Sequence, residues 1–269
     1  MDTEEIISQS YDYGEFDAAT VVTSQALAEE AAVAISYNGI NHAVMMATPA
    51  DLEDFMLGFS LSGGLIESID DVRDIEMQEE GDAISVEVTL GSRAFASFRA
   101  QRRTLVGISG CGLCGVAALE QVFSDLPMRH PRAMPPAMHL RGLRDRFAAA
   151  QTLVQRSGAM HGALYVDSQG ETRVCREDIG RHNALDKLLG ACHRQGLDLD
   201  DGFIALTSRC SLELIHKAVR SGVASLVSLS APTTMSVRWA RQYNLNLIHQ
   251  PQHSPARYYS PAPCRLTGE

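Results

Sequence analysis

Apolar residues in the first half of the chain alternate and recur in ways that predict a hairpin followed by a helix. The apolar run over 33–46 is interrupted by Asn38-Gly39, a pair that accepts the positive φ angles of a two-residue turn. Thr48 and Pro49 are predicted to begin a helix as its cap and first residue, and Gly63-Gly64 to end it. Between them the apolar positions recur at helical spacing, at Leu52, Phe55, Met56 and Phe59. Three strand-like runs follow at 72–78, 84–90 and 94–99.

The second half of the chain alternates short β-branched runs with amphipathic ones. Strands are predicted at 162–166, 172–175, 203–207, 225–230 and 246–249. Helices are predicted at 116–126, 138–155, 183–195, 212–221 and 234–242. This alternation predicts an α/β layer with at least some parallel strands, since parallel strands need crossover connections that are usually helical. The fold class expected for the whole chain is therefore α/β (α+β).

Composition along the chain suggests two domains between two tails. Residues 1–19 are acidic with few periodic apolar positions and are predicted to be a flexible tail. An N-terminal α+β domain is expected over 20–126 and a C-terminal α/β domain over 127–249, with a proline-rich connector at 127–136. Residues 250–269 are predicted to be a C-terminal tail.

Length and charge narrow the class of protein. A chain of 269 residues with 45% apolar residues can bury a full core. Its net charge of −10 argues against general nucleic-acid binding, which needs a basic face. The acidic start has no secretory signal, and no apolar run reaches the length of about eighteen residues that a membrane span needs. We therefore expect a cytoplasmic protein whose six cysteines are reduced.

Cys111 and Cys114 are the only cysteines that lie close in sequence. A Cys-x-x-Cys pair can be half of a zinc site, a redox disulfide, or a nucleophilic thiol with a resolving neighbour. Zinc is disfavoured because the remaining cysteines are single and widely spaced, at Cys175, Cys192, Cys210 and Cys264. A thioredoxin-like site is disfavoured because glycines flank the pair on both sides. No metal site is predicted.

The Cys111 segment has the features that a sulfur-carrying cysteine needs: access, backbone freedom and nearby cations that favour the thiolate. Glycines lie at Gly107, Gly110, Gly112 and Gly115. An otherwise acidic chain carries a cationic segment here, with Arg99, Arg102 and Arg103 directly upstream. Scattered arginines usually only solvate a surface, but the arginines of this segment lie on both sides of the two cysteines, from Arg93 to Arg144, and could attract an anionic acceptor.

Three polar clusters follow predicted strands in the second half. The densest is Arg176 to Lys187, where Gly180, Arg181 and His182 precede a helix whose N-terminus is suited to phosphate. Thr207-Ser208-Arg209 and Ser230 to Thr234 repeat the arrangement at later strand-to-helix junctions. Each cluster alone could be an ordinary helix cap; together they predict one cleft lined by several strand ends. His161 is left unassigned, and the zinc deaminase signature is not met, because His161-Gly162-Ala163 lacks its glutamate.

With these motifs, the chain resembles the formate dehydrogenase accessory sulfurtransferase family (FdhD/NarQ). The resemblance begins near Leu27 and is carried by Tyr37-Asn38-Gly39, Met46-Ala47-Thr48-Pro49, Glu53 to Phe59, Cys111-Gly112-Leu113-Cys114-Gly115, Glu177 to Lys187 and Ser230 to Thr233. It implies a homodimer with a cytidine-deaminase-like second domain. It also implies that sulfur is taken from a cysteine desulfurase as a Cys111 persulfide. The sulfur would be passed to the bis(molybdopterin guanine dinucleotide) form of molybdenum cofactor before that cofactor enters formate dehydrogenase.

Residues of the predicted site follow from the clusters and the resemblance together. Cys111 and Cys114 are expected to be catalytic. The expected cofactor contacts are Arg102, Arg103, Asp178, Gly180, Arg181, His182, Asn183, Ser208, Arg209, Ser230, Thr233, Gln250 and Pro255. The chain departs from the family over 250–255, where an aromatic residue and arginines are usual. The alternative from another class is a non-catalytic chaperone that binds the cofactor and in which both cysteines are structural.

Overall fold

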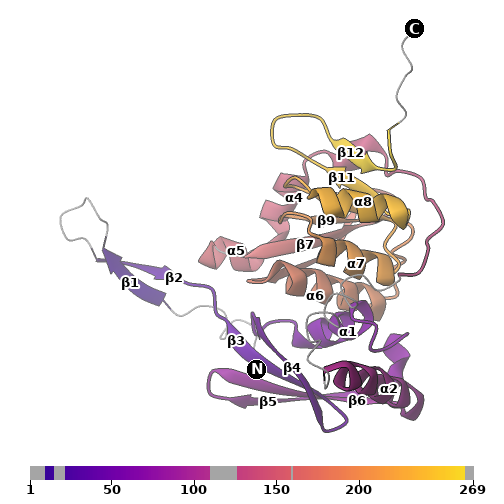
Figure 1. The fold of residues 1–269 in the computed structure, drawn as a ribbon. Coiled ribbons are helices and arrows are strands. Elements are labelled where there is room, and N and C mark those ends of the chain that lie inside the picture. Colours follow the sequence, from indigo (N-terminus) through magenta and orange to yellow (C-terminus); the bar gives the residue numbers. More distant parts are fainter. Residues whose placement is uncertain (1–9, 15–21, 110–125, 159, 264–269) are drawn as a thin grey trace.

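A computed structural model describes residues 10–14, 22–109, 126–158 and 160–263 of the chain. Within these residues, a four-stranded sheet and a six-stranded sheet form the cores of two lobes (Figure 1). We call residues 31–109 the N-terminal lobe and residues 126–263 the C-terminal lobe. A separate hairpin of β1 (Ser10–Gly14) and β2 (Val22–Ala26) projects beside them.

The N-terminal lobe packs helices on one face of its sheet. The strands are β3 (Ala31–Tyr37), β4 (Ile40–Ala47), β5 (Val72–Glu80) and β6 (Ala83–Leu90), in the order β4-β3-β6-β5. Alternate residues of β3 are buried, as period-two burial against one covering layer requires. The covering helices are α1 (Leu52–Ser62) and α2 (Ser92–Ser109), and a 3₁₀ turn, η1 (Ile69–Asp71), precedes β5.

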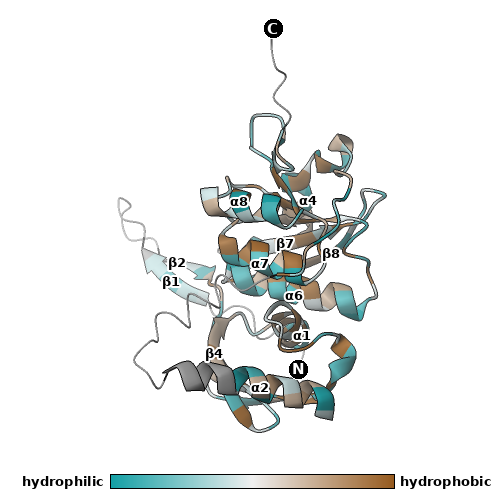
Figure 2. Ribbon diagram, turned by 45° about the vertical axis from the view of Figure 1, so that its right-hand side comes forward, coloured by the Kyte–Doolittle hydropathy of each residue, from teal (hydrophilic) through white to brown (hydrophobic). Residues whose placement is uncertain are grey.

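The C-terminal lobe is a three-layer sandwich. Its strands are β7 (His161–Val166), β8 (Thr172–Asp178), β9 (Phe203–Leu206), β10 (Ser225–Ser228), β11 (Asn246–His249) and β12 (Arg257–Ser260). Helices α6 (Arg181–Arg194), α7 (Leu212–Arg220) and α8 (Thr234–Gln242) cover one face. The other face packs against η2 (Ala137–Leu140) and α4 (Leu143–Ala150), which are followed by α5 (Thr152–Ser157). Figure 2 shows the hydrophobic residues gathered in the strands between these layers.

Strand direction decides which turns of this lobe meet. β9, β10 and β11 are mutually parallel, whereas β7 runs antiparallel to β9 and β8 antiparallel to β7. The carboxyl ends of β8 to β11 and the start of β7 therefore lie along one edge of the sheet, which we call the strand-end edge. The sheet order is β12-β11-β10-β9-β7-β8.

Most elements agree with the sequence predictions. The Asn38-Gly39 turn has both residues at positive φ, 45° and 74°, and joins β3 to β4 as predicted. The helices predicted at 183–195, 212–221 and 234–242 are present as α6, α7 and α8. The predicted mixed α/β class and its parallel strands are confirmed.

Several local predictions are wrong. Residues 94–99 belong to helix α2, because Ala94 and Phe98, one helical turn apart, are both buried against the sheet. The helix after Pro49 begins only at Leu52, with Asp51 at a positive φ of 53°. The helix predicted over 138–155 is broken into η2, α4 and α5, with Gly142 at a φ of 66°.

Both predicted tails contain strands. Ser10–Gly14 pairs with β2, and Arg257–Ser260 adds β12 to the larger sheet next to β11. The helix predicted over 116–126 falls almost wholly outside the described residues.

The two lobes meet along helices α1 and α6. A Cβ added at Gly58 would lie 1.7 Å from the carbonyl oxygen of Asp186, and one at Gly190 would lie 1.9 Å from that of Asp54. The helix backbones therefore approach more closely than any side chain at these positions would allow. Glycines on facing helices fix how the N-terminal lobe sits on the C-terminal lobe.

Candidate functional site

The strand-end edge brings together the three polar clusters that the sequence separates by up to fifty residues. α6 begins after Gly180, α7 after Ser211 and α8 after Thr233, each directly following a strand that ends at this edge. Helix N-termini present unpaired N–H groups and a partial positive charge, which favours anions. The predicted convergence of these turns is thus found in the fold.

Arg181 is the cation at the start of α6. Its Nε is buried without a hydrogen-bond partner, and within the described part of the chain it forms no ion pair with a carboxylate. The charge of Arg181 lowers the pKa values of both His161 and His182, after the larger effect of burial. Because no described carboxylate pairs with it, the Arg181 guanidinium can still donate hydrogen bonds to an acceptor from outside the chain.

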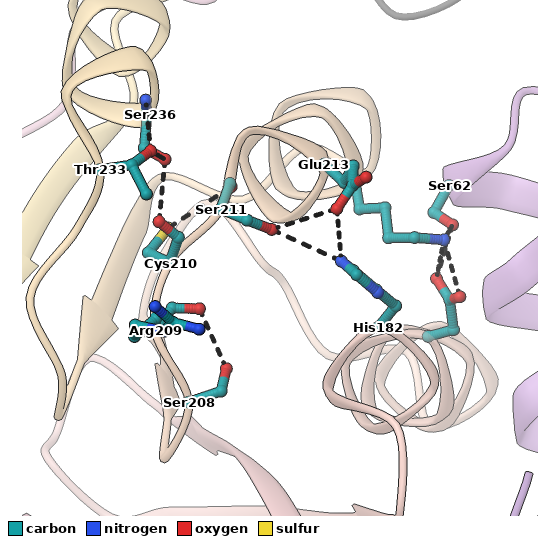
Figure 3. A network of polar contacts seen from close by, with 11 residues as sticks. Ser62, His182, Ser208, Arg209, Cys210, Ser211, Glu213, Thr233 and Ser236 are labelled. Atoms are coloured by element: carbon teal, nitrogen blue, oxygen red, sulfur yellow. Dashed lines mark hydrogen bonds and ion pairs between the residues drawn. The ribbon is translucent and has the colours of Figure 1, made fainter.

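His182 lies on the first turn of α6, facing the start of α7. Its Nε2 is 2.8 Å from a carboxylate oxygen of Glu213 and 3.4 Å from the hydroxyl oxygen of Ser211 (Figure 3). Burial lowers the pKa of His182, and Glu213 opposes the shift. Both partners reach the same ring nitrogen, so these residues do not form a Ser-His-acid relay, which needs one partner on each nitrogen.

The other two turns carry hydroxyls and one more cation. Ser208 donates to the carbonyl of Arg209 at 3.2 Å, and Ser230 donates to the carbonyl of Thr207 at 3.4 Å. Thr233 caps α8 by accepting from the amide of Ser236 at 3.2 Å (Figure 3). The Arg209 side chain is exposed and forms no ion pair with a described carboxylate, so it can turn toward a ligand at this edge.

Gln250 directly follows β11 at the same edge, and Pro255 lies on the connection from β11 to β12. Gln250 is half-buried and its amide donates to the carbonyl of Pro251 at 3.3 Å, whereas Pro255 is exposed.

Asp178 and Asn183, which the sequence assigns to cofactor contact, are turned into the protein instead. Asp178 is fully buried and accepts from the amides of Thr48 and Gly180, at 3.0 and 2.7 Å, and from the side-chain amide of Asn183 at 3.0 Å. Its remaining partner is Lys187, whose Nζ is 2.7 Å away. A carboxylate with this many donors has no free lone pair for a ligand, so it shapes the turn that presents Arg181.

Lys187 is the residue of this network that sequence reasoning missed. It is fully buried, and it also donates to the carbonyl of Thr48 at 2.9 Å, so it links the α6 helix to the N-terminal lobe. Burial lowers its pKa, and Asp178 opposes that shift. The available signal was the position of a lysine among the apolar residues of α6, on the helix face that packs inward.

The same interface holds two further buried carboxylates. Asp186 accepts from the hydroxyl of Ser62 at 2.6 Å and pairs with Lys217 at 2.7 Å. Asp54 pairs with Arg176 and Arg194, at 2.7 and 2.9 Å, although burial raises its pKa. Much of the polar density of Arg176 to Lys187 therefore serves lobe docking.

The arginines predicted upstream of the cysteines lie on α2, in the other lobe. Arg102 is exposed and donates to the carbonyl of Asn41 at 2.7 Å, and no contact joins it to the strand-end residues. The Arg103 side chain lies outside the described part of the structure. So do the predicted catalytic residues Cys111 and Cys114.

The cysteines that the structure does describe are poor nucleophiles. Cys192 and Cys210 are buried and Cys175 is half-buried. Burial raises the pKa of each thiol to about 12. All three are therefore protonated near neutral pH, and they contribute to packing without acting as nucleophiles.

Two general features concern metals and membranes. Among the described residues, no group of three or more histidine, cysteine or acidic side chains is arranged to hold a metal ion. The described helices include none that is long and apolar enough to cross a bilayer.

The structure is thus a two-lobed α/β protein whose strand-end edge carries arginines and hydroxyl groups. The model of the FdhD/NarQ family matches residues 28–266, so the chain belongs to that family. It is 42% identical over 238 residues to the sulfur carrier protein FdhD of Bordetella petrii, covering 88% of this chain and 85% of the relative. It is 45% identical over 224 residues to the FdhD of Cupriavidus necator, covering 82% of this chain and 77% of the relative.

A solved structure shares the fold. A crystal structure from Desulfotalea psychrophila, assigned as a formate dehydrogenase accessory protein, superposes with a TM-score of 0.71. The superposition covers 94% of this chain and 96% of the other, at 19% sequence identity. Both lobes of this chain therefore share their fold with that structure.

Proposed function

We propose that this protein is a sulfur carrier that receives sulfur on Cys111 from a cysteine desulfurase and delivers it to a molybdenum cofactor destined for formate dehydrogenase. The observation that carries the proposal is the state of the cysteines. Every described thiol is held protonated by burial. Of the three cysteines outside the described residues, Cys111, Cys114 and Cys264, only the first two form a closely spaced, glycine-flanked pair, which makes them the candidate for nucleophilic chemistry. The names of the two relatives, which are 42% and 45% identical to this chain over the aligned residues, support the same role.

The transfer chemistry balances within the chain when both cysteines take part, and an external thiol can replace Cys114 more slowly. The Cys111 thiolate attacks the terminal sulfur of the donor persulfide, and the donor thiolate leaves. For release at the sulfide level, the Cys114 thiolate attacks the inner sulfur of the Cys111 persulfide. A Cys111–Cys114 disulfide forms, and the outer sulfur leaves as hydrosulfide. The two cysteine sulfurs supply the two electrons that reduce it. Cys114 is thereby the internal reductant, and an external thiol must later reduce the disulfide.

The residues of the strand-end edge fit the anionic end of such a cofactor. The Nε of Arg181 is buried without a partner, and Arg209 is exposed beside the start of α7. Arg181 and Arg209 would hold phosphate oxygens, while the hydroxyls of Ser208 and Thr233 and the N-terminal amides of α6 and α7 supply neutral donors. The bound cofactor supplies the metal that accepts sulfur.

The first test separates a carrier from a chaperone. Protein incubated with a cysteine desulfurase and cysteine is examined by mass spectrometry, and a sulfur adduct is expected on Cys111. Cys111→Ala should lose the adduct and activation of formate dehydrogenase together. Cys114→Ala should keep the adduct and slow delivery, and the matched control Cys175→Ala should change neither. Absence of any adduct on wild-type Cys111 would favour a chaperone with structural cysteines.

A second test addresses the strand-end edge. GDP is titrated at low and high ionic strength, and its affinity should fall as salt rises because binding rests on charge. Arg181→Ala should weaken GDP binding by roughly tenfold or more, the loss of one charge-assisted hydrogen bond. Unchanged affinity in this variant would remove the edge from the cofactor site.

A further inference from the structure

The N-terminal lobe holds a cavity that the proposed function does not use. It has a volume of about 330 Å³ and opens between α1, α2 and the start of β4. Its lining is His42, Phe59, Gly63, Leu65, Phe98, Gln101 and Arg102. None of these residues except Arg102 was singled out as a binding residue from the sequence.

The cavity wall is aromatic. The His42 ring lies 6.0 Å from the Phe59 ring at 72° and 5.7 Å from the Phe98 ring at 59°, measured between ring centroids. Burial lowers the pKa of His42 and the neighbouring Arg102 lowers it further, so the imidazole is neutral near pH 7. Because the Phe98 ring is buried, the accessible faces on which a planar ring can stack are those of His42 and Phe59.

The polar side chains of the cavity, Gln101 and Arg102, lie at one side of it, on α2. Gln101 uses its Nε2 to donate to the carbonyl of Gly64 at 3.1 Å, which leaves its carbonyl oxygen as an acceptor. Arg102 uses one guanidinium nitrogen on the carbonyl of Asn41 and forms no ion pair with a described carboxylate. The cavity therefore offers a hydrogen-bond acceptor and a positive charge next to aromatic faces.

A second cation approaches from the C-terminal lobe. Arg220 lies against Gly64, where an added Cβ would be 2.5 Å from its guanidinium, and Gly64 sits between two lining residues of the cavity. Within the described residues, Arg220 too lacks an ion pair with a carboxylate. Arginines from both lobes thus give this region a positive potential that an anion would complement.

We propose that this cavity binds a nucleoside monophosphate, with the base stacked against Phe59 and His42 and the phosphate on Arg102. A stacking surface, one side-chain amide and a guanidinium that forms no ion pair with a described carboxylate match a planar base that bears an anionic group. The volume lies at the lower end of the range of about 300–1,000 Å³ for small-molecule sites. The site is separate from the strand-end edge and goes beyond the proposed function.

The test is a calorimetric titration of the full chain with GMP and with AMP, each alone. Arg102→Ala should weaken binding by roughly tenfold or more, as expected for loss of a charge-assisted contact. The matched control is Arg99→Ala, an exposed arginine one turn away on α2 that stacks on Phe95 outside the cavity. Arg181→Ala should leave this binding in place, which distinguishes the cavity from the strand-end edge.

Two further arms test the stacking. Leu65→Trp should fill the cavity and abolish binding, and its fold is verified by circular dichroism. Ribose 5-phosphate, which lacks the base, should bind at least tenfold more weakly than the nucleotide. The proposal is overturned if neither nucleotide binds, if ribose 5-phosphate binds equally well, or if Arg181→Ala abolishes binding while Arg102→Ala does not.

Discussion

Two regions of this protein carry dense charge, and they use it in opposite ways. At the lobe interface, Asp54, Asp178 and Asp186 are buried and each is paired with at least one cation. At the strand-end edge, Arg181 and Arg209 have no described carboxylate partner. At the interface the charged side chains pair with one another, whereas at the edge the arginines remain available to a ligand. One run of sequence, Arg176 to Lys187, contributes to both.

The difference shows why polar density alone does not locate a binding site. Burying a charge costs several kcal/mol unless partners replace its water, so a buried and saturated carboxylate is committed to the fold. A cation at a helix N-terminus without a carboxylate partner can exchange water for a ligand. The state of pairing, which only the structure shows, separates the two roles.

The largest effect is expected from breaking the central pair of the interface. Lys187→Met leaves Asp178 buried without its cation and should lower the free energy of unfolding by about 3–5 kcal/mol. Chemical denaturation followed by circular dichroism measures the change. The control is Arg93→Met, whose pair with Glu67 is solvent-exposed on both sides and should matter by less than about 1 kcal/mol. Equal losses in the two variants would contradict the structural role of the buried pair.

A smaller effect is expected from the glycine contact between α1 and α6. Replacing glycine by alanine within a helix normally stabilises it by about 1 kcal/mol. Gly190→Ala should instead destabilise the protein by about 1–3 kcal/mol, because the new methyl group meets the backbone of Asp54. The sign of the change is therefore diagnostic. A stabilised Gly190→Ala variant would show that the helices can separate without cost.

Sequence reasoning recovered the elements whose signals are local. The Asn38-Gly39 turn and the amphipathic helices α6 to α8 were predicted because turn chemistry and periodicity act within a few residues. It failed where tertiary contacts decide. Residues 94–99 form a helix because Phe98 packs under the sheet, and β12 is a strand because β11 offers an edge.

The same limit applies to the site. The convergence of three strand ends followed from α/β topology, which sequence order largely determines. The inward orientation of Asp178 could not be predicted, because its partner Thr48 is 130 residues away in sequence. The cavity beside Arg102 also escaped notice, since its lining comes from separate elements and carries no motif.

The smallest effect is expected on the pH dependence of the free energy of unfolding. It concerns His182, which lies where the strand-end edge meets the lobe interface. Burial lowers the pKa of His182 below the ordinary histidine value of 6.5. As pH falls through 6.5, the unfolded chain therefore takes up a proton that folded His182 does not. The free energy of unfolding should fall from that pH down to the folded pKa and then stop changing on this account.

His182→Gln should make the profile of unfolding free energy against pH shallower between pH 7 and 5. Because burial also lowers the pKa values of His161 and His249, the variant should reduce the slope without removing it. A steeper profile in the variant would mean that Glu213, which opposes the shift, outweighs burial at His182.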